Sequence, residues 1–98
     1  MKKLKPIHPG EILREEFLLP MNVSQTKLAE DTGISPAEVE KIINEKTAIS
    51  PNAALRLSLY FGLSERFWLN LQSRYDLETE KDKVADKLIK EVRILQVA

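Results

Sequence analysis

The stretch SQTKLAEDTGISPAEVEKII, residues 24–43, contains the signals that decide the fold. It reads as two short helices joined by a tight turn, because Gly33 can take the positive φ needed to leave the first of them. Ser35 and Pro36 then start the next helix with a serine cap and a proline at the first helical position. Three residues after the serine, Glu38 completes a capping box. The stretch therefore predicts a helical hairpin with a sharp turn at Gly33.

The apolar residues of this hairpin follow the spacing of a DNA-binding helix-turn-helix. Ala29 is small, as is needed where two helices cross closely. Ile34 anchors the turn by placing its side chain in the core. Val39 and Ile42 lie three residues apart, so they hold the second helix of the hairpin against Leu28. The other side of that helix is then free to face the major groove of DNA. A helical hairpin without a nucleic-acid role is the alternative reading.

Start and stop signals outside this stretch predict three further helices. Apolar residues at helical spacing run from Ile12 to Leu18, and Pro20 closes that helix because proline cannot continue it. Ser50–Pro51 repeats the start signal, and Gly62 is placed to end the helix in the left-handed conformation. Ser64 caps a last helix. That helix contains Phe67, Trp68 and Leu71, whose spacing favours a core or dimer contact for at least one of the two aromatic residues.

The chain changes character after Leu77. Residues 78–98 carry five acidic and five basic side chains. One apolar stripe is formed by Val84, Leu88, Val92 and Leu95. Such a narrow stripe could pack back on the domain, pair with its copy, or stay frayed until a partner arrives. We expect an all-α fold: a five-helix repressor-like helix-turn-helix domain over residues 1–77, and an additional charged amphipathic helix or tail over residues 78–98.

Composition narrows the function class. The 98 residues suit one compact unit, and the chain is 43% hydrophobic and 31% charged, as in globular proteins. With no cysteine and one histidine, it offers neither a disulfide nor a metal cage, and we expect no cofactor. His8 precedes Pro9 and is expected at a helix start. We expect no enzyme, because no nucleophile or acid-base pair has positioned partners.

The sequence contains neither a signal peptide at its start nor a membrane span. Residues 1–6 include Lys2, Lys3 and Lys5, but no apolar segment of signal-peptide length follows them. Every apolar run is too short to span a bilayer. We therefore expect a cytoplasmic protein with no membrane partner.

Ten residues are candidate DNA contacts on the geometry of docked helix-turn-helix motifs: Ser24, Gln25, Thr26, Ser35, Ala37, Glu38, Lys41, Asn44, Lys46 and Thr47. Those near the start of the second hairpin helix, from Ala37 to Lys41, are expected to reach base edges. The first hairpin helix opens with short polar side chains and free N–H groups, which suit phosphates. Lys46 and Thr47 would add backbone contacts after the second helix.

Each candidate also has a purely structural reading. Ser24 can act only as a cap, and Lys41 and Lys46 can be solvated surface. For Glu38 we favour the capping box. For Gln25 we favour DNA contact, because nothing in helix capping requires an amide there.

The net charge of the chain does not indicate a nucleic-acid partner. The whole chain has a formal net charge of zero. Residues 24–47 carry three lysines against five acidic side chains, a formal charge of minus two. Affinity for DNA would therefore depend on helix N-termini, on the lysine-rich start of the chain and on dimerisation.

Longer motifs resemble the HigA family of antitoxins, a branch of the Xre-like, repressor-type helix-turn-helix proteins that includes virulence-associated protein I. The resemblance covers residues 8–77. It is carried by His8-Pro9-Gly10-Glu11-Ile12-Leu13, Ser24-Gln25, Leu28-Ala29, Gly33-Ile34-Ser35, Ile43-Asn44, Ala54-Leu55-Arg56-Leu57, Phe61-Gly62, Phe67-Trp68-Leu69-Asn70-Leu71-Gln72 and Tyr75-Asp76-Leu77. The opening motif and the Phe67–Gln72 run are the most particular to this family.

The resemblance implies a homodimer that binds a palindromic operator before its own operon and neutralises an mRNA-cleaving, ribosome-dependent toxin of the HigB type. The chain departs from the family pattern at Asn44-Glu45-Lys46-Thr47, where relatives often have Asn-Gly-Lys-Arg, and at Ala37 and Glu38, where a basic residue is frequent. A free-standing repressor without a toxin is the second reading. The third reading is a protein-binding module whose helix-turn-helix no longer binds DNA, and it is motivated by the acidic charge of the motif.

Overall fold

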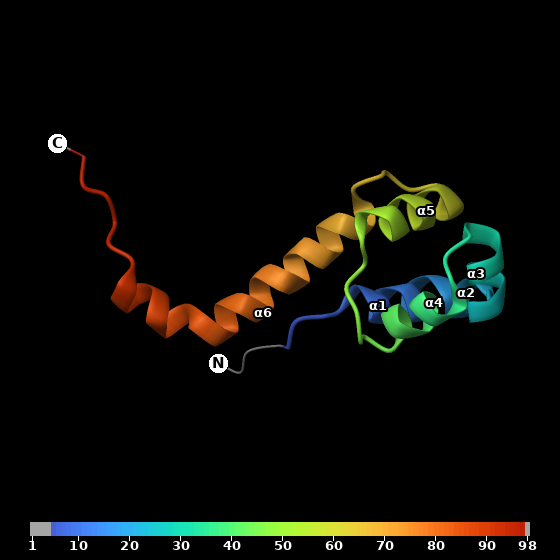
Figure 1. Ribbon diagram of the computed structural model, residues 1–98, viewed down its shortest axis with the longest axis horizontal. Coiled ribbons are helices and arrows are strands. Elements are labelled where there is room, and N and C mark those ends of the chain that lie inside the picture. The colour runs from blue at the N-terminus through green and yellow to red at the C-terminus, as the bar shows by residue number, and fades with distance from the viewer. Residues whose placement is uncertain (1–4, 98) are drawn as a thin grey trace.

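The computed structural model describes residues 5–97, and these residues form helices and no strand. The elements are α1 (Pro9–Ile12), η1 (Leu13–Leu18), α2 (Leu19–Met21), α3 (Gln25–Thr32), α4 (Pro36–Ile43), α5 (Pro51–Phe61) and α6 (Phe67–Glu91) (Figure 1). Because α1, η1 and α2 follow one another without a break, they make one helix, and the described chain has five helices. This confirms the all-α class. None of these helices is long and apolar enough to cross a membrane.

The first helix does not end where proline was expected to end it. It continues past Pro20 to Met21 and stops at Asn22, which has a left-handed φ of 56°. The reason is the π-helical turn η1, in which the N–H of Leu19 donates to the carbonyl of Arg14, five residues earlier. A proline inside an α-helix meets the carbonyl four residues before it, and the wider π turn moves that carbonyl away. The expected closure at Pro20 is therefore wrong.

Three predicted serine caps are confirmed. The Oγ atoms of Ser24, Ser35 and Ser50 each accept a hydrogen bond from the N–H three residues further on, at 3.0, 3.1 and 3.1 Å. The two predicted glycine stops are also confirmed, with φ of 76° at Gly33 and 69° at Gly62. These five positions fix both ends of α3 and of α5 and the start of α4, so most of the helix-turn-helix boundaries follow from local signals.

The remaining two helix starts give one confirmation and one correction. His8 begins α1 as expected, and its Nδ1 accepts a hydrogen bond from the N–H of Gly10 at 2.9 Å. Ser64 does not cap the last helix. Instead a turn intervenes, Arg66 is the N-cap without a side-chain cap bond, and only the backbone carbonyl of Ser64 accepts from Phe67, at 3.1 Å.

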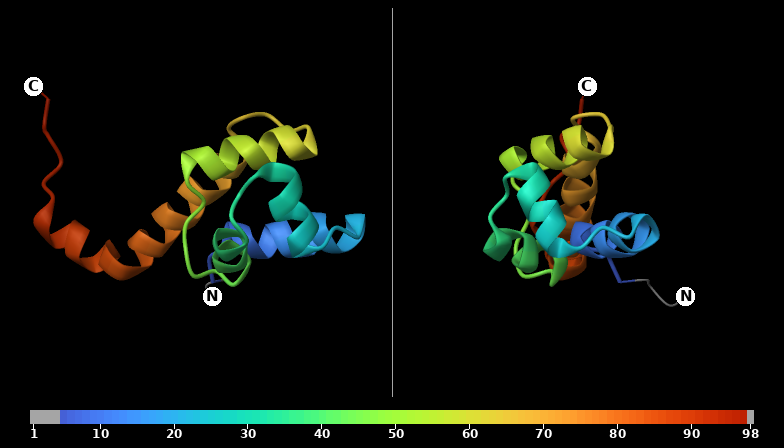
Figure 2. Two further views of the ribbon diagram at one scale, coloured as in Figure 1. Left: turned by 45° about the vertical axis from the view of Figure 1, so that its right-hand side comes forward. Right: turned by 90° about the vertical axis from the view of Figure 1, so that its right-hand side faces the viewer.

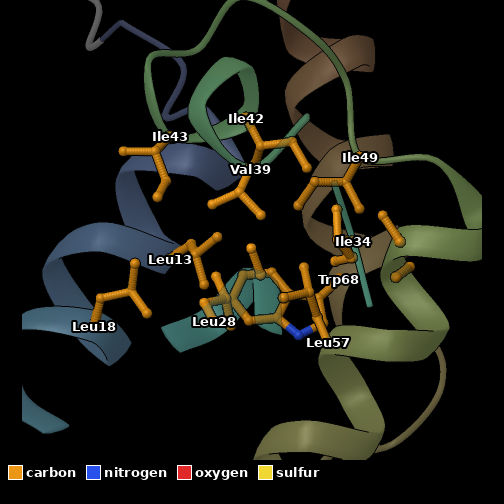
Figure 3. Close-up of a cluster of buried hydrophobic side chains, with 13 residues drawn as sticks. Leu13, Leu18, Leu28, Ile34, Val39, Ile42, Ile43, Ile49, Leu57 and Trp68 are labelled. Atoms are coloured by element: carbon orange, nitrogen blue, oxygen red, sulfur yellow. The ribbon is translucent and has the colours of Figure 1, made fainter. Parts of the chain in front are cut away.

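The core lies where the helices of the domain meet (Figure 3). Its buried apolar side chains are Leu13, Leu18, Leu28, Ala29, Ile34, Val39, Ile42, Ile43, Ile49, Ala53, Ala54, Leu57 and Trp68. The five apolar residues that identified the motif, from Leu28 to Ile42, are all among them. The predicted buried face of the hairpin is therefore confirmed, and the opposite face of α4 is left at the surface.

Trp68 is the largest of the fully buried side chains. Its ring centroid lies 5.1 Å from that of Phe17, 6.2 Å from that of Phe61 and 5.1 Å from that of Phe67. Each of these pairs is tilted or edge-on, the geometry that aromatic pairs prefer. The core reading of Trp68 is confirmed, and α6 is anchored to the first helix and to α5 through this residue.

The second half of α6 leaves the domain (Figure 1 and Figure 2). The helix is continuous from Phe67 to Glu91, so the expected boundary after Leu77 falls inside one helix and not between two. The radius of gyration is 17.0 Å, against about 13 Å for a compact chain of roughly 100 residues. Leu77, Leu88 and Val92 are 61%, 46% and 61% exposed. The tail is thus not packed back on the domain.

Candidate nucleic-acid interface

The ten candidate residues lie on three neighbouring pieces of the chain. Three are at the start of α3, four on or just before α4, and three in the turn after it. Eight of them are exposed, whereas Glu38 and Thr47 are partly buried. In Figure 2, α3 and α4 are neighbours, and α4 also lies against the start of the first helix.

The start of α3 offers backbone donors to a ligand. Ser24 uses its Oγ to accept from the N–H of Lys27, while Gln25 and Thr26 are exposed in the first two positions of the helix. The first N–H groups of a helix have no partner within it, and the helix dipole favours an anion at this end. The arrangement suits a phosphate group, with the amide of Gln25 beside it.

Two sides of α4 have different surroundings. Val39 and Ile42 are 1% exposed and face the core, whereas Ala37 and Lys41 are exposed on the other side. Glu38 is partly buried, and its N–H donates to Ser35, which satisfies the serine half of the capping box. An α4 with a buried apolar side and a free side carrying Lys41 has the form of a recognition helix.

The turn after α4 is held by backbone hydrogen bonds. The N–H of Lys46 donates to the carbonyl of Lys41 at 2.8 Å, and the N–H of Glu45 donates to that of Ile42 at 3.0 Å. This is the Schellman arrangement, which requires a left-handed residue, and Glu45 has φ 62°. A side chain in this conformation costs about 1–2 kcal/mol, which glycine would not. The turn nonetheless fixes Lys46 close to the end of α4.

Residues of the first helix hold the end of α4 in place. Arg14 Nη1 donates to the carbonyl of Ile43 at 3.1 Å. Gly10 lies against the carbonyl of Ile42 so closely that a Cβ there would collide with it. These two contacts join segments about thirty residues apart in the chain, so no local sequence signal could have revealed them.

Two further contacts brace the motif from α5 and α6. The side chain of Gln72 is buried, and its Oε1 accepts from the N–H of Ile49 at 2.8 Å, which ties the loop after α4 to α6. Arg56 Nη1 donates to the carbonyl of Thr32 at 2.9 Å and so holds the end of α3. Sequence reasoning named both residues only within family motifs and assigned neither of them a structural role. The candidate surface is therefore held by hydrogen bonds from α5 and α6.

The charge of the motif is partly neutralised within it. Lys27 Nζ lies 3.0 Å from Asp31 Oδ2, and the hydroxyl of Tyr60 donates to the same carboxylate at 2.7 Å. The hydrogen bond from Tyr60, followed by the one from Lys27, lowers the pKa of Asp31, and the same carboxylate raises the pKa of Lys27 and of Tyr60. Asp31 therefore stays ionised beside Lys27. Of the three lysines of the motif, Lys41 and Lys46 are the two outside this cluster.

The lysine-rich start of the chain is described only in part. Lys2 and Lys3 lie outside the described residues 5–97. Lys5 is exposed and lines a hollow of about 220 Å³ beside α6, with Pro6, Ile7 and Tyr75 among its neighbours.

Known proteins are similar to this one in both sequence and fold. The helix-turn-helix family matches residues 13–68. Virulence-associated protein I of Dichelobacter nodosus is 44% identical, over 89% of this chain and 82% of that protein. The solved Pseudomonas aeruginosa antitoxin HigA with its higBA promoter superposes with a TM-score of 0.89 at 42% identity, covering 93% of this chain and 99% of that one.

A second solved DNA complex, antitoxin GraA with its operator, also has a TM-score of 0.89, at 40% identity over 99% of this chain and 98% of that one. The family match spans more than half of the chain, and both solved antitoxins cover nearly all of it. The chain belongs to the HigA family of Xre-like helix-turn-helix proteins.

Proposed function

We propose that this protein is an antitoxin that binds operator DNA as a homodimer and represses its own operon. The observation that carries the proposal is α4, whose core-facing side is buried while Ala37 and Lys41 are exposed on a rigidly held helix. Two relatives at 40–42% identity were solved with promoter or operator DNA. In the proposed complex α4 enters the major groove, and the start of α3 and the turn at Lys46 contact phosphates. We propose no catalytic role.

Two lysine substitutions separate base reading from phosphate contact. Lys46→Ala should weaken binding to all DNA sequences alike and reduce the slope of log K against log salt by about one. Lys41→Ala should instead relax discrimination at one base pair, by about 1–3 kcal/mol if the contact is bidentate. Gel-shift titrations on the promoter of the protein, at several salt concentrations and with single-base variants, measure both effects.

Lys83→Ala is the matched control, because it removes a lysine from α6, away from the motif. It should leave operator affinity and base discrimination unchanged. If Lys41→Ala and Lys46→Ala both change only the salt slope, α4 does not read bases through Lys41 and that assignment is wrong. No binding by the intact protein at low salt would favour the protein-binding module.

We also propose that the operon encodes a toxin of the HigB type, which this protein neutralises. The support is the family, whose solved members include two proteins described as antitoxins. An adjacent reading frame for a small basic protein would favour this proposal. Its absence would favour a free-standing repressor with the same DNA-binding surface.

The DNA-binding unit is proposed to comprise residues 1–77, with residues 78–98 as a separable tail. Beyond Thr79 the side chains of α6 are exposed except for Val84, which is partly buried, so few core contacts would be lost. A chain truncated after Leu77 should therefore keep its helical circular dichroism and its cooperative thermal unfolding. If truncation unfolds the domain, the tail is part of the core and the boundary is misplaced.

A further inference from the structure

Lys27 has the position of a phosphate contact. It lies in the first turn of α3, three residues after the cap Ser24 and next to the exposed Gln25 and Thr26. In docked helix-turn-helix motifs, the first helix of the pair crosses the DNA backbone. A lysine at this place adds a positive charge beside the helix N-terminus, where the helix dipole already favours an anion. We would therefore expect Lys27 to strengthen binding to DNA of any sequence.

The structure gives Lys27 a partner within the protein. Its Nζ lies 3.0 Å from Oδ2 of Asp31, one turn further along α3, and the two side chains are 59% and 35% exposed. An exposed ion pair four residues apart on a helix is weak, because water screens it and both side chains lose freedom. The pair alone would therefore yield easily to a phosphate group.

A third side chain strengthens this pair from another helix. The hydroxyl of Tyr60, on α5, donates to the same Oδ2 of Asp31 at 2.7 Å. The ring of Tyr60 is partly buried and packs edge-on against Phe61, with 5.0 Å between the ring centroids. A carboxylate that is already anchored loses less freedom when it binds an ammonium group. The hydrogen bond from Tyr60, followed by the one from Lys27, lowers the pKa of Asp31, so the carboxylate stays charged at neutral pH.

We propose that Asp31, anchored by Tyr60, withholds Lys27 from the phosphate backbone and so limits the affinity of the helix-turn-helix for DNA. The proposal rests on the proposed function, because it concerns the strength of the same DNA-binding face. Asp31 and Tyr60 act through Lys27 and are positioning residues. A phosphate contact carries no sequence information. The contact therefore limits binding to unrelated DNA as much as binding to the operator.

A purely structural contact that fastens α3 to α5 is the competing interpretation. Under it, neutralising Asp31 leaves DNA affinity unchanged or lowers it through loss of stability. Under the proposal, the same change raises affinity, because Lys27 is released. Asp31→Asn separates the two interpretations. The amide oxygen can still accept the hydrogen bond from Tyr60, whereas the negative charge that binds Lys27 is gone.

Fluorescence anisotropy with a labelled promoter duplex and with an unrelated duplex measures the effect. At about 100 mM salt, Asp31→Asn should bind both duplexes about 3–10-fold more tightly, and its slope of log K against log salt should be steeper by about one. Glu30→Gln is the matched control, because it removes the same charge from the neighbouring position of α3. It should leave the slope unchanged. Equal gains in affinity and slope for the two variants would show that only net charge matters, and would overturn the proposal.

Two further variants assign the gain to Lys27 and Tyr60. Adding Lys27→Ala to Asp31→Asn should abolish the gain, and a gain that persists would contradict the release of Lys27. Tyr60→Phe changes no charge and keeps the ring, so it should raise affinity in the same direction by a smaller factor. Unchanged affinity for Tyr60→Phe would contradict the anchoring role of the hydroxyl. Circular dichroism melting of each variant checks that the domain is folded.

The same titrations separate this proposal from the proposed function. If the intact protein binds its promoter but Asp31→Asn brings no gain, only the role of Asp31 is wrong. If neither the intact protein nor Asp31→Asn binds DNA at low salt, the DNA-binding function itself is contradicted.

Discussion

Replacing Trp68 with alanine is expected to lower the free energy of unfolding by about 3–5 kcal/mol. The indole is completely buried and touches the rings of Phe17, Phe61 and Phe67, so its loss leaves a cavity at the junction of three helices. Small domains are stable by only about 5–15 kcal/mol. The melting temperature should therefore fall by roughly 20 °C, as followed by circular dichroism.

The matched substitution is Leu59→Ala, because Leu59 is 84% exposed and contributes little to the monomer core. It should change the melting temperature by no more than a few degrees. A Trp68→Ala protein that melts within the same few degrees of the intact protein would show that the core is not centred on this residue.

Local signals predicted most of the fold. The serine caps at Ser24, Ser35 and Ser50 and the left-handed glycines at Gly33 and Gly62 act within a few residues of the helix ends that they fix. Their effect can be read from the sequence without knowledge of the rest of the chain. The spacing of the apolar residues in the hairpin was sufficient for the same reason.

Two helix boundaries were predicted wrongly from the sequence. A π-helical turn allows the first helix to pass Pro20, and proline chemistry alone does not reveal that turn. Ser64 has the residue type of a cap, but the chain makes one more turn before α6 starts. In both cases the helix boundary differs from the one that the local residue type favours.

The supports of the candidate site were also beyond local reasoning. Arg14 reaches the carbonyl of Ile43 across 29 positions, and Gln72 reaches the N–H of Ile49 across 23. Neither pair has a sequence pattern that identifies it. The exposed candidate DNA contacts were easier to predict. Once the buried side of a helix-turn-helix is known, few positions remain that can face DNA.

Operator binding by the face formed by Gln25, Lys41 and Lys46 is the claim on which the function rests. Alanine at all three positions should reduce affinity for the native operator by at least about 100-fold, because it removes the base contact of Lys41, worth about 1–3 kcal/mol, and the contacts of Gln25 and Lys46 with the DNA backbone. All three side chains are exposed, so folding should not change. Circular dichroism on the same sample checks that it does not.

The most direct measurement is a gel-shift titration of this triple variant on the promoter of the protein, at low and at moderate salt. Lys83→Ala with Lys90→Ala is the control, since it removes the same number of positive charges, two, but from α6. The account predicts native affinity for the control and severe loss for the folded triple variant. Normal, salt-sensitive binding by the triple variant would contradict the assigned DNA-binding face.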